Sequence, residues 1–146
     1  MGTVIITGGT RGIGRSCVLK LSDLGYDVIF TWSSLKTEAI SLQEEVRSKG
    51  KNCSAIKLQL EKDNIKEKFL QIDSLISSPI VALVNNAAID GGRGEFISKS
   101  RDEWVNIFQI NVFGLIEMTS EAFNRMAISL GGAGGSIVNL TSQVAS

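Results

Sequence analysis

Segments with the apolar pattern of strands alternate with segments that have the pattern of helices, and this alternation restricts the chain to few folds. Five short runs are predicted as strands: 3–7, 27–32, 56–60, 80–84 and 136–140. Between most of them, apolar residues recur three or four positions apart, which is the spacing of one helix face. Strands that alternate with helices form a parallel sheet covered on both faces. We therefore expect an α/β protein with a doubly wound parallel sheet, in one domain over residues 1–146.

The two most apolar runs, 3–7 and 80–84, are expected at the centre of this sheet. A parallel strand that is buried on both faces is apolar throughout rather than alternating. This predicts the strand order 3-2-1-4-5. A crevice is then expected at the carboxyl ends of the first and fourth strands, where the order reverses.

A glycine-rich loop, TGGTRGIG from Thr7 to Gly14, lies between the first predicted strand and the first predicted helix. Gly8 permits a tight exit from the strand, Gly12 lets a ligand approach the backbone, and Gly14 lets the helix pack close to the sheet. The helix N-terminus adds unpaired N–H groups and a partial positive charge, which favour an anion. The loop therefore predicts a site for the pyrophosphate of a dinucleotide, with the spacing G-x-x-x-G-x-G instead of the common G-x-G-x-x-G.

A long helix is predicted from Ser100, which forms a capping box with Glu103, to about Ile128. We expect one apolar stripe of this helix to face the sheet: Trp104, Phe108, Leu115 and Ala122. A second apolar stripe consists of Val105, Val112, Ile116 and Phe123. A single sheet contact buries one stripe, so the second stripe predicts a partner surface, with burial inside the same chain as the alternative.

Charge and composition exclude several classes of partner. Fifteen basic residues balance fifteen acidic ones and there is no histidine, so the chain lacks the positive field that holds nucleic acid or an anionic membrane. No segment approaches the ~18 apolar residues of a membrane helix, and no secretory leader is recognisable. Cys17 and Cys53 are far apart and suit small buried side chains in a reducing compartment. We expect a cytoplasmic protein without a metal site.

Four motifs resemble those of the short-chain dehydrogenase/reductase family. TGGTRGIG is similar to that family's cofactor loop, and NNAA (Asn85 to Ala88) is similar to its Asn-Asn-Ala-Gly, with Ala88 in place of the glycine. Asn111 resembles the family's helix asparagine, and the run that leads to Ser142 resembles its serine strand. The resemblance is strongest to reductases of the 3-oxoacyl-carrier-protein and glucose dehydrogenase types. It implies a Rossmann-type fold, of which this chain has the N-terminal, cofactor-binding portion and lacks the family's last two strands.

The resemblance also implies an oxidoreductase that interconverts a carbonyl and a secondary alcohol of a small substrate by hydride transfer. In this family a tyrosine, with its pKa lowered by a lysine four residues later, supplies the proton. The serine orients the carbonyl, and the helix asparagine holds a water; Ser142 and Asn111 match these two catalytic roles. The Tyr-x-x-x-Lys pair has no counterpart, because Tyr26, the only tyrosine, is at the start of the second strand and the chain ends at Ser146.

NADP(H) is expected in preference to NAD(H). An NAD enzyme carries a carboxylate about 20 residues past the glycine loop, for the ribose 2′-OH, whereas the second strand here ends in TWSSLK. Arg11 stands where NADP-preferring relatives carry a basic residue, and Ser33, Ser34 and Lys36 offer further donors for a 2′-phosphate. Gln59 replaces an aspartate that relatives often have near the adenine. The implied cofactor-binding residues are Gly8, Thr10, Arg11, Gly12, Ile13, Gly14, Trp32, Ser33, Ser34, Gln59, Leu60, Asn86, Ala87 and Ala88.

Three hypotheses remain open at this point. The chain is a portion of an NADP-dependent oxidoreductase, a naturally short nucleotide-binding protein that senses or regulates without catalysis, or an interaction subunit that completes its sheet on another chain. Without the Tyr-x-x-x-Lys pair, the 146 residues alone are expected to bind cofactor but not to catalyse. The fifth strand, without charge or proline, would be an edge open to pairing. A homo-oligomer is therefore expected, through this strand or through the helix from Ser100 to Ile128.

Overall fold

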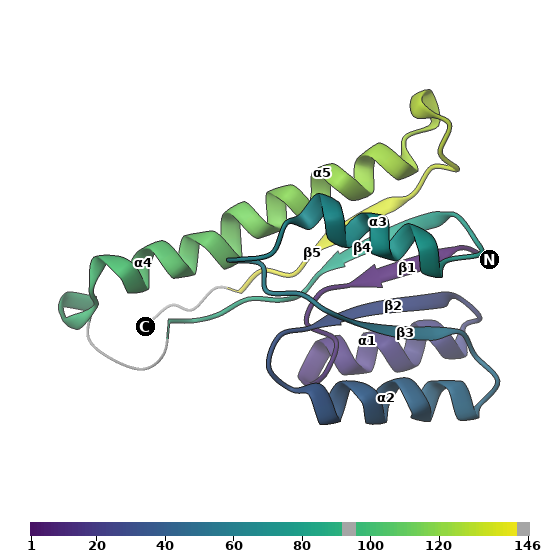
Figure 1. Ribbon diagram of the computed structural model, residues 1–146, viewed down its shortest axis with the longest axis horizontal. Coiled ribbons are helices and arrows are strands. Elements are labelled where there is room, and N and C mark those ends of the chain that lie inside the picture. The colour runs from purple at the N-terminus through teal and green to yellow at the C-terminus, as the bar shows by residue number, and fades with distance from the viewer. Residues whose placement is uncertain (92–95, 143–146) are drawn as a thin grey trace.

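The sheet has the strand order that the sequence predicts. The computed structural model describes residues 1–91 and 96–142, and within them five parallel strands pair in the order β3-β2-β1-β4-β5 (Figure 1). The strands are β1 (Thr3–Ile6), β2 (Asp27–Trp32), β3 (Cys53–Lys57), β4 (Ile80–Asn85) and β5 (Ser136–Asn139). β1 and β4 are central, as their apolar sequences predict. The order reverses beside β1, so the loops after β1 and β4 diverge and leave a crevice at the carboxyl ends of the strands.

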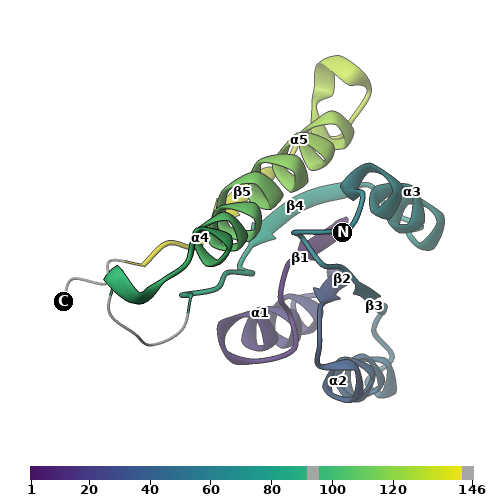
Figure 2. The ribbon, with the colours of Figure 1, turned by 60° about the vertical axis from the view of Figure 1, so that its left-hand side comes forward.

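Helices cover both faces of the sheet. The α-helices are α1 (Gly12–Asp23), α2 (Lys36–Ser48), α3 (Ile65–Leu75), α4 (Arg101–Phe108) and α5 (Leu115–Met126); η1 (Phe96–Ser98) and η3 (Ile128–Leu130) are short 3-10 helices, and η2 (Gln109–Gly114) is a π-helix. Figure 2 shows α1 and α2 on one face and α3, α4 and α5 on the other. Side chains along a strand alternate between the faces. Ile5 and Ile29 pack with α3 and α5, whereas Ile6 and Phe30 pack with α1 and α2.

The third strand lies earlier in the sequence than predicted. The alternation of Ile56, Leu58 and Leu60 predicts a strand over 56–60, but β3 ends at Lys57. The Leu58 N–H still donates to the Trp32 carbonyl at 2.8 Å, so this residue remains beside β2. The chain then turns, and Leu60 belongs to the turn. The alternating apolar pattern therefore predicts which side chains are buried but not where the strand ends.

The long helix from Ser100 to Ile128 is wrong as a single element. Ser100 caps α4 and forms the predicted capping box with Glu103. After Phe108 the chain makes the π-helix η2, and α5 then continues to Met126. A π-helix has more residues per turn than an α-helix. The apolar spacing of α4 therefore does not predict which face of α5 contacts the sheet.

The predicted contact of this helix with the sheet is also wrong in part. Phe108 was expected to face the sheet but is 54% exposed, because α4 lies beyond the carboxyl ends of the strands (Figure 1). The sheet contact is made instead by Met118, Ala122 and Met126 of α5, each at most 4% exposed. Ala122 is the predicted residue that is fully buried there.

The second predicted stripe is exposed along α4, η2 and α5, and we call it the outer stripe. Its members are 38% to 55% exposed: Val105, Val112, Ile116 and Phe123. Within the described residues, β5 pairs with β4 alone, and its Val138 is 49% exposed. None of the helices in the described ranges is both long enough and apolar enough to cross a membrane.

Candidate functional site

A cavity of about 480 Å³ lies at the carboxyl ends of the first four strands, and we call it the carboxyl-end cavity. Its walls come from the glycine loop, the end of β2, the turn after β3, the segment after β4, and η2. The predicted cofactor-binding residues that line it are Gly8, Thr10, Arg11, Gly12, Ile13, Trp32, Ser33, Ser34, Gln59, Leu60, Asn86, Ala87 and Ala88. Residues that lie far apart in the sequence and are predicted to bind the same cofactor therefore surround one cavity.

The backbone of the glycine loop needs glycine at two of the predicted positions for its conformation. Gly8 and Gly12 have φ of 67° and 54°, in the left-handed region that favours glycine. A Cβ added to Gly12 would meet no atom within 4 Å, so the space beside its backbone is open to a ligand. Gly14 does not line the cavity and is buried, and a Cβ there would overlap the Gly8 carbonyl and lie 2.6 Å from Asn86 Nδ2. These three positions thus provide a turn, an approach and a close contact.

The segment after β4 is tied to the glycine loop and to β5. Asn86 Nδ2 donates to the carbonyl oxygens of Thr7 and Gly8, both at 2.9 Å. Asn85 is 4% exposed, and its Nδ2 donates to Asn139 Oδ1 at 2.9 Å and to Thr119 Oγ1 at 3.0 Å. Asn86 therefore holds a wall of the cavity, whereas Asn85 joins β4 to β5 and α5.

The end of β2 forms a wall without acidic groups. Trp32 is half-buried, and Ser33 and Ser34 are exposed beside it. The Lys57 ammonium lies 5.9 Å from the centre of the Trp32 ring, within the range of a cation–π contact. Arg11 is exposed at the N-terminus of α1 and makes no ion pair within the described ranges. Lys36, the other predicted cation, does not line the cavity.

Asn111 and Ser142, the two predicted catalytic residues, do not line the cavity. Asn111 lies in η2, and its side chain bonds both backbone groups of Ile89: Oδ1 accepts from the N–H at 2.9 Å and Nδ2 donates to the carbonyl at 2.7 Å. Ser142 is exposed beyond the end of β5. Tyr26 precedes β2 and so lies at the opposite end of the sheet from the cavity. Asn111 thus fixes a residue that does line the cavity.

Several lining residues were missed by the sequence analysis. They are Thr31, Leu35, Leu58, Glu61, Ile89 and Ile110. Each of the six is adjacent in the sequence to a predicted residue, so a wider window around those residues would have found them. The hydrogen bond from the Ile89 N–H to Asn111 Oδ1, across 22 positions, leaves no sequence signal.

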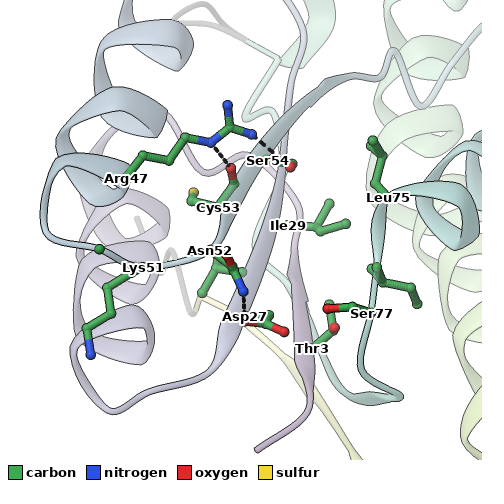
Figure 3. A pocket seen from close by; sticks show the side chains of 13 residues that line it. Thr3, Asp27, Ile29, Arg47, Lys51, Asn52, Cys53, Ser54, Leu75 and Ser77 are labelled. Carbon is green, nitrogen blue, oxygen red and sulfur yellow. Dashed lines mark hydrogen bonds between the residues drawn. The ribbon is translucent and has the colours of Figure 1, made fainter.

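A second cavity, of about 500 Å³, lies at the amino ends of β1, β2 and β3 (Figure 3). Two of its charged side chains, Asp27 and Arg47, have hydrogen-bond partners. Asp27 accepts from Asn52 Nδ2 at 2.9 Å and from Ser78 Oγ at 2.8 Å, and Arg47 Nε donates to the Cys53 carbonyl at 2.7 Å. Lys51 points away from the other side chains (Figure 3). This cavity offers no set of converging free groups, so the carboxyl-end cavity is the candidate site.

Comparison with known proteins identifies the family. The short chain dehydrogenase family model matches residues 2–146. The chain is 32% identical over 144 residues to the 3-oxoacyl-[acyl-carrier-protein] reductase FabG of Staphylococcus epidermidis, covering 97% of this chain and 57% of that protein. It is 35% identical over 140 residues to the uncharacterized oxidoreductase YohF of Escherichia coli, covering 94% and 53%. The chain thus spans a little over half the length of these relatives.

Solved structures give the same result. Acetoin dehydrogenase from Enterobacter cloacae superposes with a TM-score of 0.85 at 30% identity, covering 97% of this chain and 55% of that one. A metagenomic short-chain oxidoreductase in complex with NADP has a TM-score of 0.87 at 22% identity, covering 98% and 63%, and shares the fold. With a family match along almost its whole length, the chain belongs to the short-chain dehydrogenase family.

Proposed function

We propose that the chain binds NADP(H) in the carboxyl-end cavity and forms the cofactor-binding part of an oxidoreductase that interconverts a small carbonyl compound and its secondary alcohol. The proposal rests on family membership together with the lining of the cavity. NADP(H) supplies or accepts the hydride. The residues of this chain bind and orient it.

The observation that carries the proposal is the open space beside the backbone of Gly12, at the start of α1. Nothing lies within 4 Å of where its Cβ would be, and Gly12 lines the cavity. The first N–H groups of a helix have no partner within the helix, and the helix dipole adds partial positive charge. A diphosphate beside Gly12 therefore receives backbone donors and favourable charge without steric obstruction.

The preference for a 2′-phosphate is proposed from the end of β2. Arg11 supplies a cation from the glycine loop, and Ser33 and Ser34 supply hydroxyl donors from the end of β2; all three line the same cavity. No carboxylate follows β2 before the start of α2, so none is placed there to repel a phosphate or to accept from a ribose hydroxyl. Glu61 lines the cavity on the separate turn after β3. We place the adenine beside this turn, against Gln59 and Leu60.

For the catalytic step, we propose that Ser142 orients the carbonyl and that Asn111 acts from η2. In this chain Asn111 holds the backbone of Ile89, which lines the cavity, so the asparagine positions one wall of the site. The Tyr-x-x-x-Lys pair of the family has no counterpart in the 146 residues. Cofactor binding is therefore the function proposed for these residues themselves, and reduction is proposed for a protein that also contains the pair.

We also propose self-association through the outer stripe. Its four large apolar side chains are each at least 38% exposed. Large exposed apolar side chains are a feature of protein interfaces when they form a contiguous patch. A second copy of the chain, with the same stripe, would bury it symmetrically.

Calorimetric titration tests the cofactor proposal. The chain is titrated with NADPH, NADH and adenosine separately at fixed ionic strength. We expect NADPH to bind most tightly, then NADH, with adenosine weakest because it has no phosphate. Equal affinities for NADPH and NADH would contradict the 2′-phosphate assignment, and no binding of either would contradict the proposed function.

A further inference from the structure

Gly114 is the last residue of η2, and its backbone does not require glycine. Its φ of −60° and ψ of −40° are helical angles that any residue adopts. Glycine in a helix is less favourable than alanine by about 1 kcal/mol. Another feature of the structure must therefore account for a glycine here.

That feature is the contact between Gly114 and Leu60. A Cβ added to Gly114 would lie 2.7 Å from Leu60 Cβ and 3.2 Å from Leu60 Cδ2, and 3.2 Å from the Gln109 carbonyl oxygen. The shortest distance involves the Cβ of Leu60, which moves only when the backbone moves. Leu60 lines the carboxyl-end cavity, whereas Gly114 is buried behind it.

The turn that carries Leu60 is closed by its own hydrogen bonds. The Gln59 N–H donates to Asp63 Oδ2 at 2.8 Å, and the N–H groups of Lys62 and Asp63 donate to the Gln59 carbonyl at 3.0 and 2.8 Å. Because these bonds hold the turn together, a push on Leu60 displaces Gln59 with it. Both residues belong to the wall of the cavity.

The helical side of the contact is held more firmly. Three residues before Gly114, the side chain of Asn111 makes two hydrogen bonds to the backbone of Ile89. Four residues after it, Met118 is fully buried in the core. A retreat of the helix would break these contacts, so the turn is the part that yields.

We propose that Gly114 is a positioning residue for the cofactor site, and that its missing side chain lets η2 hold Leu60, and with it Gln59, where an adenine binds. This inference rests on the proposed function, which assigns the adenine to that wall. A methyl group at position 114 pushes the turn into the cavity. The effect falls on any ligand that contains adenine, with or without a 2′-phosphate.

The test compares the full chain with its Gly114→Ala variant by calorimetric titration with NADP⁺ and with adenosine 2′-monophosphate. We expect both dissociation constants to rise roughly ten-fold, the effect of an overpacked contact of the usual size. Met126→Ala is the control for lost stability alone, because Met126 is buried in α5 and does not line the cavity. It should lower the melting temperature and leave both dissociation constants unchanged.

A second variant isolates the contact. Leu60→Gly removes both Leu60 atoms that a methyl group would meet. Because Leu60 itself lines the cavity, Leu60→Gly is the reference for the double variant. Relative to that reference, Gly114→Ala should lower neither the affinity nor the melting temperature. If Gly114→Ala does not fold by itself, recovery of folding by Leu60→Gly supports the proposal. Unchanged affinity in Gly114→Ala, or an equal loss in both backgrounds, would overturn it. Binding by the unmodified chain tests the proposed function separately, since its failure is seen before any variant is compared.

Discussion

The hydroxyl of Thr7 accepts two hydrogen bonds, from the N–H groups of Asn86 and Ala87, both at 3.0 Å. Thr7 is 2% exposed and directly follows β1, and Asn86 directly follows β4. Asn86 returns a bond from its side chain to the Thr7 carbonyl at 2.9 Å. The exits of the two central strands are thereby held together where the glycine loop begins.

Thr7→Val is expected to destabilise the fold by about 2–4 kcal/mol, because it leaves two backbone N–H groups without their acceptor in a mostly buried place. Thr7→Ser retains the hydroxyl and is the matched control, with a smaller loss from the missing methyl group. Chemical denaturation measures both. A Thr7→Val variant as stable as Thr7→Ser would show that the shared hydroxyl contributes nothing.

Arg11→Ala is expected to weaken NADP(H) binding by about 1–3 kcal/mol, the range for hydrogen bonds to charged groups. NAD(H) has no 2′-phosphate, so its affinity should hardly change. Arg15→Ala provides the control, since Arg15 lies one turn further along α1 and pairs with Glu45 at 2.6 Å. Titration of both cofactors measures the difference, and equal losses for NADP(H) and NAD(H) would refute the role of Arg11.

Cys53 is expected to be inert to thiol reagents in the folded protein. Burial raises the pKa of its thiol from 9.0 to about 12, and the neighbouring Arg47 lowers it by less. The reactive species is the thiolate, so at pH 8 the half-buried Cys17 should react first and Cys53 only on unfolding. Labelling followed by mass spectrometry distinguishes the two, and equal labelling of both thiols in the native chain contradicts the expectation.

The raised pKa of Cys53 also makes the free energy of unfolding depend on pH. The folded state holds the Cys53 proton up to about pH 12, whereas the unfolded state releases it above about pH 9. The contribution of the protonated Cys53 thiol to stability is complete below pH 9. It is lost as the pH rises toward 12, at up to about 1.4 kcal/mol per pH unit. Cys53→Ala should remove that part of the slope, which urea denaturation at several pH values measures.

The sequence predicted the elements that depend on local signals. Gly8 and Gly12 are needed for their backbone conformation, and the apolar runs are long enough to identify the two central strands. The break in the long helix escaped prediction because Gln109–Gly114 contains no proline, and its apolar pattern does not distinguish the i→i+4 hydrogen bonds of an α-helix from the i→i+5 bonds of a π-helix. The contact of Leu60 with Gly114 joins two distant segments and is visible only in three dimensions.

The final prediction concerns the outer stripe. Ile116 and Phe123 are both 55% exposed, and β5 offers Val138, 49% exposed, as a second apolar surface. We expect the outer stripe to dominate association, because it presents four large apolar side chains that are each at least 38% exposed. Sedimentation at micromolar concentration should then show a dimer of the unmodified chain.

Phe123→Glu places a charge within this expected interface, where its desolvation is unfavourable without a partner, and should give monomers. Val138→Glu places the same charge on β5 and should leave the dimer intact if the helices form the contact. The reverse pattern would locate association at the strand edge, where unpaired N–H and C=O groups promote pairing with another chain. A monomer that melts cooperatively without any substitution would refute both surfaces, because neither apolar face would then need a second copy to be stable in water.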